Sequence, residues 1–410
     1  MLEDWTAALD SGRSVDCIYF DYQKAFDTVP HERLLYKLSQ YGIDAKIISW
    51  IRSFLTGRKQ RVFVNGSSSH WSDVISGIPQ GSVLGPLLFV LYVNDIPNLL
   101  SEGTSILMFA DDTKLYRQIK SDDDAKSLQE DVSKLENWSN KWQLQFHPTK
   151  CKTMRISSKD QAPNKYKLYN TDLDTTTAER DLGVIVDNKL NFNEHIAKQS
   201  KKANMVMGII RRTFKHLDDK MFVKLFKALV RPHLEYAQAV WHPQHAKEIN
   251  LIESVQRRAT KQVPKMKDMS YQERLEKLKL PSLLYRRLRG DMIEVYKRTH
   301  GHYDQDIKCP LAFNKQTARV TRGHTFKLFF RRPRLDCRKH FFAYRVVQNW
   351  NSLPDSMVNA KSLFSFENKL DIAWHHLKYD FDSLLKYKDN ISKIKPSQTG
   401  RNNDNVDLDI

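Results

Sequence analysis

Two acidic clusters, each directly after an apolar segment, constrain this chain more than any other feature. The tetrad Phe109-Ala110-Asp111-Asp112 follows the apolar run 106–108, and the apolar segment 15–20 ends at Asp21. Each pattern predicts a strand that ends in carboxylates. Two such strands side by side would bring Asp21, Asp111 and Asp112 into one small volume. Carboxylates so close repel one another unless a cation lies between them.

This arrangement indicates phosphoryl-transfer chemistry. Magnesium is a hard ion, held by one or two carboxylates together with substrate phosphates. Paired ions about 3.5–4 Å apart clamp the attacking and the leaving oxygen of a phosphoryl transfer. The sequence therefore predicts nucleotidyl transfer with two Mg²⁺ ions, or Mn²⁺ in their place. On its own, Asp111-Asp112 would be better explained as an ordinary hairpin turn, since Asp favours turns.

Three blocks of sequence, in this order, resemble motifs A, B and C of the reverse transcriptases of non-LTR (LINE-type) retrotransposons, and the jockey-like and chicken-repeat clades are nearest. The blocks are 20–30 (FDYQKAFDTVP), 76–86 (SGIPQGSVLGP) and 109–113 (FADDT). The resemblance is sharp across residues 15–190 and looser to about 350. It implies an RNA-directed DNA polymerase that uses an RNA template, a DNA primer and deoxynucleoside triphosphates.

The resemblance also assigns roles to the acidic residues and to one lysine. Asp21 and Asp111 ligate both metals, and Asp112 completes the acidic patch. Lys150 matches the motif D lysine, which protonates the pyrophosphate leaving group, although Lys152 is close enough to take that role instead. Asp27 is interpreted as structural, because an acid near a helix start stabilises the helix dipole.

Four further residues belong to nucleotide and template binding. Phe26 lies where related enzymes carry an aromatic that packs against the sugar C2′ and excludes ribonucleotides; the alternative is plain core packing. Gln80 can reach a base or backbone, Gly81 permits close backbone approach, and Pro79 stiffens the turn.

The segment Arg180-Asp181-Leu182-Gly183-Val184 resembles motif E, the primer grip. There a hairpin holds the 3′ end of the growing strand, with Leu182 and Gly183 at its centre. An ordinary hairpin with Gly183 at a bulge explains the segment equally well.

The element order predicts an α+β fold, with a polymerase palm of split βαβ type followed by helices. We expect a palm over 1–158, a primer-grip-like β unit over 159–192, a helical thumb over 193–280, a basic, mostly helical region over 281–375 and a disordered polar tail over 376–410. Within the palm, one helix is expected over 31–55 and a hairpin around Asn65-Gly66.

Basic charge is concentrated in the C-terminal half. The chain has a net charge of +18. Residues 195–350 contain 35 Lys and Arg against 13 Asp and Glu, so this segment is more positive than the chain as a whole. Nucleic-acid phosphates are the natural counter-charge, with binding that weakens as salt rises. Most of the aromatic rings in this half lie at helical spacing and are interpreted as core.

Composition limits the location of the protein. The four cysteines are scattered, without metal-ligand spacing or the density of a secreted scaffold, and the N-terminus lacks a signal-peptide core. The longest apolar stretch is far short of the ~20 residues that a membrane span needs. We expect an intracellular protein of the nucleus or cytoplasm, with no membrane partner.

Only about twenty residues precede Asp21, whereas the family carries a basic fingers region there and an endonuclease further upstream. We therefore expect a part of a longer element, weak or inactive as a polymerase alone. The alternatives are an inactive or domesticated remnant that binds RNA, and a maturase-like splicing cofactor.

Overall fold

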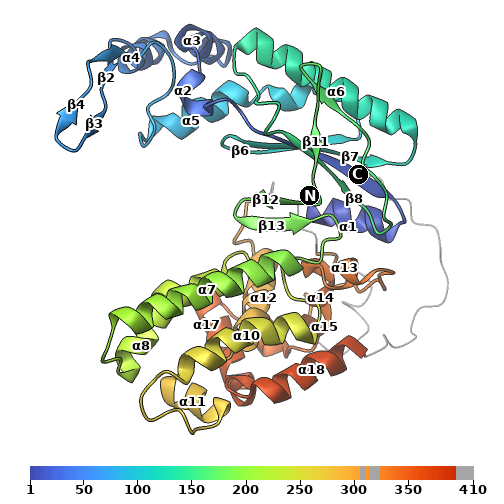
Figure 1. Cartoon of the computed structure of the whole chain (residues 1–410). Helices are drawn as coiled ribbons and strands as arrows, with labels where there is room; N and C mark the ends of the chain where they lie inside the picture. Colours follow the sequence, from blue (N-terminus) through green and yellow to red (C-terminus); the bar gives the residue numbers. More distant parts are fainter. Residues whose placement is uncertain (305–310, 314–323, 394–410) are drawn as a thin grey trace. The chain divides into compact units, whose positions relative to one another are not determined.

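The structure is a computed structural model that describes residues 1–304, 311–313 and 324–393. The chain forms two compact units, which we call the sheet unit (Met1–Asn191) and the helical unit (Phe192–Ile410) (Figure 1). The combination of a sheet and helices agrees with the α+β class predicted above.

A five-stranded sheet organises the sheet unit. Its strand order is β11-β8-β1-β7-β6, in which β1 (Ser14–Phe20) is central and antiparallel to both β7 (Asp112–Ile119) and β8 (Lys152–Ile156). β6 (Thr104–Phe109) pairs antiparallel with β7, and the short β11 (Asp174–Thr175) pairs parallel with β8. The two predicted apolar strands are therefore β1 and β6, and β7 lies between them.

Helices cover both faces of this sheet (Figure 1). On one face, Ile18 and Leu115 belong to a core with α5 (Leu84–Val93) and α6 (Asp122–Trp142). On the other face, Trp5 of α1 (Leu2–Asp10) packs edge-on against Tyr116 of β7, with ring centroids 5.8 Å apart. Because β1 is buried on both faces, its apolar residues do not alternate with polar ones, and its one charged residue, the buried Asp16, forms an ion pair with Arg155 at 2.7 Å.

Residues 31–55 form two helices, so the expectation of one helix is wrong. α3 (His31–Gln40) stops before Gly42, which has a φ of +74°, a left-handed conformation that ends helices. The Asp44 side chain then accepts a hydrogen bond from the Lys46 amide at 2.8 Å and caps α4 (Ala45–Leu55).

The predicted hairpin around Asn65-Gly66 is present. β3 (Phe63–Val64) pairs with β4 (Ser67–Ser68) across the two-residue turn, and both turn residues have positive φ. Behind it, β2 (Lys59–Gln60) pairs with β5 (Ser72–Asp73). A second hairpin joins β12 (Ala178–Asp181) to β13 (Val184–Asp187), and β9 (Lys167–Leu168) pairs with β10 (Thr171–Asp172).

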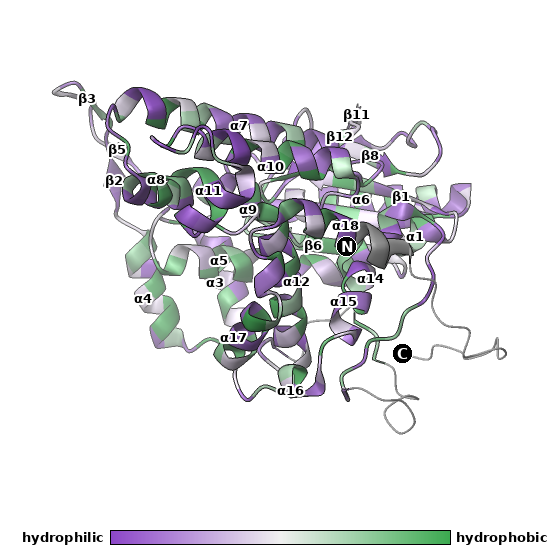
Figure 2. Cartoon of the chain, turned by 90° about the horizontal axis from the view of Figure 1, so that it is seen from below, coloured by the Kyte–Doolittle hydropathy of each residue, from purple (hydrophilic) through white to green (hydrophobic). Residues whose placement is uncertain are grey.

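The helical unit is built from longer helices followed by short ones. Its elements are α7 (Asn193–Thr213), α8 (Asp219–Leu225), α9 (Arg231–Glu235), α10 (Ala246–Thr260), α11 (Tyr271–Leu278), α12 (Leu283–Thr299), α13 (Asp336–Lys339), α14 (Phe342–Arg345), α15 (Val347–Asn351), α16 (Asp355–Val358), α17 (Leu363–Ala373) and α18 (Phe381–Lys393). In Figure 2, α7 and α10 show hydrophilic and hydrophobic residues interspersed, as amphipathic helices do.

Aromatic rings of the helical unit are mostly core, as expected. Phe222, Phe226, Trp241 and Tyr285 are buried, whereas Tyr236 is exposed. Among the helices in the described part of the chain, none is both long and apolar enough to cross a bilayer.

The expectation of a disordered tail from residue 376 is wrong for its first part. α18 (Phe381–Lys393) follows there, and Phe381 and Leu384 are buried in the core of the helical unit. Two apolar side chains one helical turn apart suffice to dock a short terminal helix. Residues 394–410 lie outside the described residues.

Candidate active site

Asp21 lies one residue beyond the end of β1, where the segment 145–151 fixes its backbone. The His147 amide donates to the Asp21 carbonyl oxygen at 2.7 Å, and the Asp21 amide donates to Sγ of the buried Cys151 at 3.4 Å. Two residues further along the chain, the Gln23 amide donates to the Gln145 carbonyl oxygen at 2.8 Å. The backbone is held while the Asp21 side chain stays about half exposed.

Asp111 and Asp112 lie at the turn between β6 and β7. Phe109 pairs with Asp112, which leaves Ala110 and Asp111 as the two turn residues, and Ala110 has a φ of +52°. This left-handed conformation is uncommon for alanine and is kept only where the surrounding structure holds it. The tight turn presents both carboxylates at the strand end, as the sequence predicts.

The register of β1 and β7 brings the two acidic clusters together. Phe20, the last residue of β1, pairs with Thr113, and the same register continued by one residue sets Asp21 opposite Asp112. Directly opposed residues of an antiparallel pair have Cβ atoms about 4.5–5.5 Å apart. The predicted neighbourhood of Asp21 and Asp112 therefore follows from strand pairing.

Burial and charge crowding both affect the pKa of Asp112. Burial raises the pKa of Asp112, and the charges of Asp111, Asp181 and Asp21 raise it further, while Lys114 lowers it. Carboxylate oxygens are the ligands that hard divalent cations prefer, and a cation would relieve this repulsion. The donor chemistry therefore fits Mg²⁺. Within the described residues, however, no three Asp, Glu, His or Cys side chains already form a group that could hold a metal ion.

Two lysines lie near this acidic group and differ in what they contact. Lys150 Nζ is 3.6 Å from Asp21 Oδ1, with both side chains about half exposed. Lys152 Nζ instead pairs with Glu179 Oε2 at 3.1 Å. Of the two candidates for the motif D role, Lys150 is the one that reaches Asp21.

Phe26 lies on the short helix α2 (Ala25–Thr28) and stacks on Phe89 of α5, with ring centroids 4.7 Å apart. Its ring is partly buried against the core of the sheet unit. One face thus packs as a core residue would, and the partial exposure leaves the predicted contact with a sugar available.

Asp27 connects the block 20–30 to the block 76–86, a role that its position in the sequence did not indicate. Gln80 Nε2 donates to Asp27 Oδ1 at 3.1 Å, and Ser76 Oγ donates to the Asp27 carbonyl at 2.9 Å. Gly77 has a φ of +88°, and a Cβ there would lie 2.6 Å from the Asp27 carbonyl oxygen. Asp27 does lie in the first turn of α2, as expected, but it also positions the predicted template-binding Gln80.

The remaining residues of that loop are arranged more openly. Pro79 is partly exposed and Gly81 is exposed with a φ of +80°, and a Cβ at Gly81 would meet no atom within 4 Å. Open space beside Gly81 agrees with the predicted close approach of another molecule.

The hairpin of β12 and β13 is anchored beside the acidic group. Leu182 and Gly183 form its two-residue turn, with φ of +45° and +84°, so Gly183 lies in the turn itself and not at a bulge. Asp181, the last residue of β12, forms an ion pair with Lys114 of β7, and both side chains are largely buried. The sequence did not indicate this anchoring role of Asp181, because nothing local distinguishes it from other acids at strand ends.

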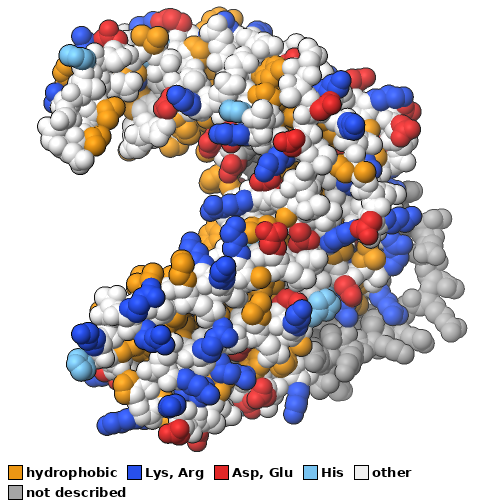
Figure 3. All heavy atoms as spheres, in the orientation of Figure 1, with side chains coloured by type: hydrophobic (Ala, Val, Ile, Leu, Met, Phe, Trp, Pro, Cys, Tyr) orange, Lys and Arg blue, Asp and Glu red, His pale blue; other side chains and the backbone are white. Residues whose placement is uncertain are grey.

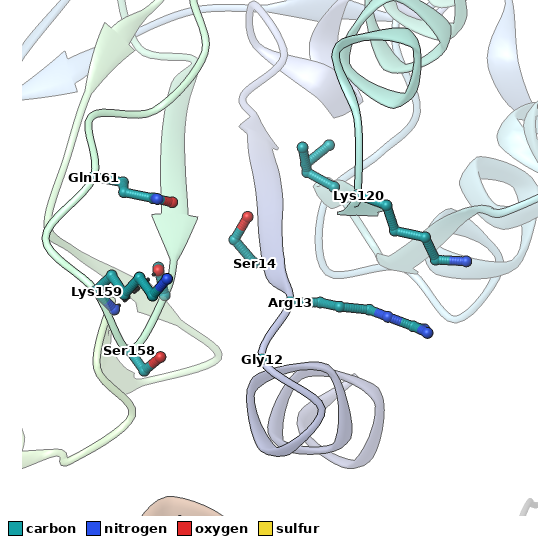
Figure 4. Close-up of a pocket in the computed structure, with 9 residues that line it drawn as sticks. Gly12, Arg13, Ser14, Lys120, Ser158, Lys159 and Gln161 are labelled. Carbon is teal, nitrogen blue, oxygen red and sulfur yellow. Dashed lines mark hydrogen bonds between the residues drawn. The ribbon is translucent and has the colours of Figure 1, made fainter.

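A separate cavity of about 340 Å³ lies at the opposite end of β1 (Figure 4). Ser14 begins β1 there, seven residues from Asp21, which corresponds to roughly 23 Å of extended strand. Arg13, Lys120 and Lys159 contribute to its lining. In Figure 4 the Arg13 and Lys120 side chains extend away from Lys159 and Gln161. This cavity is therefore not part of the acidic site.

Comparison with known proteins identifies the family of the sheet unit. Residues 4–186 match the family described as reverse transcriptase (RNA-dependent DNA polymerase). The motif-based identification is thereby confirmed: this part of the chain is a reverse-transcriptase domain.

The similar curated proteins include the RNA-directed DNA polymerases of the jockey, X-element and BS non-LTR elements. The chain is 29% identical over 314 residues to the RNA-directed DNA polymerase from mobile element jockey of Drosophila funebris, covering 72% of this chain and 33% of that protein. It is 27% identical over 270 residues to the probable RNA-directed DNA polymerase from transposon X-element of Drosophila melanogaster, covering 64% and 29%. The chain thus spans about a third of the length of these relatives.

A solved telomerase from Candida albicans aligns over 68% of this chain and 52% of its own, with 13% identity and a TM-score of 0.38. A likeness this slight supports no argument about the fold.

Proposed function

We propose that the chain is the catalytic part of an RNA-directed DNA polymerase of a non-LTR retrotransposon, which extends a primer 3′-hydroxyl with deoxynucleotides on an RNA template. The observation that carries this proposal is the register that sets Asp21 opposite Asp112, beside Asp111, inside a reverse-transcriptase domain. In this proposal the five-stranded sheet with its helices is the palm, and α7–α11 belong to a thumb.

Asp21, Asp111 and Asp112 are the residues that would hold two Mg²⁺ ions, or Mn²⁺. Such ions supply charge stabilisation at the transferring phosphoryl group and lower the pKa of the attacking hydroxyl. Burial is the main cause of the raised pKa of Asp112, and the neighbouring carboxylates raise it further; this crowding of carboxylates is the feature that supports cation binding.

The other residues act on the substrates. Lys150, next to Asp21, carries a proton that suits the pyrophosphate leaving group. Gln80, whose amide donates to Asp27, would contact the template or the incoming base, with Pro79 and Gly81 in the loop around it. The turn Leu182-Gly183, anchored through Asp181 and Lys114, would support the primer end.

Primer extension with Mg²⁺ and with Mn²⁺ tests the proposal. Asp111→Asn removes one ligand charge without changing the size of the side chain, so the weak extension expected of the parent chain should fall at least about a hundredfold, to the level of a reaction without protein. RNA affinity should stay within about twofold, because the lost charge faces the metal and not the phosphate backbone. Asp123→Asn, at an exposed acid of α6, is the matched control and should extend normally.

An inactive RNA-binding remnant is the second candidate, favoured by the excess of basic residues over 195–350. RNA binding without extension under either metal would support this candidate. Extension that survives Asp111→Asn would support it too, because such extension would come from a contaminant.

A further inference from the structure

The hairpin around Asn65-Gly66 carries large apolar side chains that its own packing does not require. Every residue from 59 to 73 is exposed. Phe63 is 67% exposed and Trp71 is 59% exposed. Val62 and Val64, on either side of Phe63, are also more than half exposed. Figure 3 shows hydrophobic side chains among those at the surface of the sheet unit. Consecutive exposed apolar residues mark an interaction surface more often than chance.

The geometry of the hairpin displays its rings on a defined surface. β2 pairs with β5 as Lys59↔Asp73 and Gln60↔Ser72, whereas β3 pairs with β4 as Phe63↔Ser68 and Val64↔Ser67. The two ladders differ by one residue, and the Ser69 amide donates to the Val62 carbonyl at 2.8 Å. His70 is therefore an extra residue, a bulge, and bulges re-aim the side chains beside them.

An arginine accompanies the exposed rings. The Arg61 guanidinium lies 4.6 Å from the Trp71 ring centre, and the β2–β5 register makes these two residues a cross-strand pair. Arg61 and Phe63 are two positions apart, the spacing that puts side chains on one face of an extended strand. The surface thus combines an indole, a phenyl ring and a guanidinium.

The root of the hairpin is tied to the loop that holds Gln80. Arg58 Nη2 donates to the Gly77 carbonyl at 3.2 Å, and the Val74 amide donates to the Arg58 carbonyl at 2.9 Å. Gly77 is also the residue in contact with Asp27. A strand bound along the hairpin would therefore be continuous with the region of Asp27 and Gln80.

We propose that this hairpin is a stacking platform for single-stranded nucleic acid, with Phe63, Trp71 and Arg61 as its contact residues and the incoming template strand as its ligand. Aromatic rings and arginine bind single strands by stacking on bases, without sequence preference. Charge supports nucleic acid over a protein partner, because Arg58, Lys59 and Arg61 face a single acid, Asp73, in this segment. The naming of the strand as template rests on the proposed polymerase function.

Binding of a labelled single-stranded RNA to the whole chain, measured by fluorescence anisotropy, tests the platform. Phe63→Ala and Trp71→Ala should each weaken binding about tenfold, because a base–aromatic stack contributes on that scale. The loss should persist at high salt, since stacking is not a charge interaction. Trp50→Ala on α4 is the matched control: Trp50 is 58% exposed, lies outside the hairpin, and should leave binding within about twofold.

Three results would overturn the proposal. In the first, the hairpin variants bind RNA as the Trp50→Ala variant does. In the second, they bind double-stranded and single-stranded RNA with equally reduced affinity, which indicates that the loss does not come from stacking on unpaired bases. In the third, they lose self-association in sedimentation while RNA affinity is unchanged, which assigns the surface to a protein contact.

Failure of the polymerase function gives a different result. If the parent chain never extends a primer while the hairpin variants still lose affinity for single-stranded RNA, the proposed function fails and the platform stands.

Discussion

At the scale of single residues, the sheet unit places charged and aromatic side chains where their surroundings change their chemistry. Asp112 is one case, and Lys37 is another. Lys37 Nζ donates to the Asp95 carboxylate at 2.6 Å and lies within 5 Å of the ring centres of Tyr92, Trp138 and Trp142. Residue types alone indicated neither environment, because both depend on which elements pack together.

Lys37 predicts a pH dependence of stability. Burial lowers the pKa of Lys37 from 10.5 to about 8, and this effect outweighs the opposing effect of Asp95. The unfolded chain therefore binds more protons than the folded one between these two values, so this lysine makes the fold more stable as pH rises through that window. The gain should reach at most about 3 kcal/mol. Chemical denaturation from pH 7.5 to 10.5 should show the rise in the parent relative to Lys37→Met.

A second lysine variant is the control for this pH dependence. Lys46, at an exposed position of α4, is the control, and Lys46→Met should leave the pH profile of the parent unchanged. Parallel profiles for the parent and Lys37→Met would show that Lys37 keeps its charge throughout.

Phe26 predicts the selection of the sugar. Because its ring is fixed on one side by Phe89, Phe26→Val should open space beside C2′ and let ribonucleotides in, while deoxynucleotide incorporation survives. Incorporation ratios from single-nucleotide extension should shift by at least about tenfold. An unchanged ratio would assign Phe26 to core packing, which a fall in thermal stability of the variant would accompany.

At the scale of elements, close backbone contacts join the motifs. The loop before α5 lies against α2, and Gly77 allows that approach. Gly77→Ala should destabilise the fold by about 3 kcal/mol, because it combines a strained φ with an overlap at the Asp27 carbonyl. Gly81→Ala carries the same kind of strain, in open space, and should cost only about 1 kcal/mol. Urea denaturation of both variants measures the difference, and equal losses would remove the steric argument.

At the scale of the whole molecule, the two units differ in their net charge. The excess of Lys and Arg falls in the helical unit, and Figure 3 shows many basic side chains on the face of it that is drawn. Lys198, Lys201 and Lys202 are exposed on α7. Even without sequence-specific contacts, such a surface binds nucleic acid through its phosphates.

The salt dependence of RNA binding follows from this charge. The logarithm of the affinity of the chain for single-stranded RNA should fall linearly with the logarithm of salt concentration, by about 0.7 for each phosphate contacted. Replacing Lys198, Lys201 and Lys202 by Gln should make that slope shallower. Trp71→Ala should instead lower the affinity and leave the slope unchanged. A titration series at several salt concentrations measures both, and an unchanged slope in the lysine variant would place the phosphate contacts elsewhere.

The sequence by itself determined the local features of this protein. Apolar runs gave β1 and β6, Asn65-Gly66 gave its hairpin, and the three motifs gave the reverse-transcriptase domain, which the family match confirms. Each of these depends on neighbours in the chain, through side-chain periodicity, turn conformation or a block of adjacent residues. The acidic residues could be proposed for the same reason.

Only the tertiary structure decided how distant segments meet. Strand register set Asp21 opposite Asp112, packing joined Asp27 to Gln80 and Lys114 to Asp181, and core burial ordered α18 where the polar sequence indicated disorder. These contacts join residues separated by 53 to 91 positions, or depend on a core assembled from many helices. A one-residue change of register would move every one of the strand contacts to the other face, and no local pattern in the sequence specifies that choice.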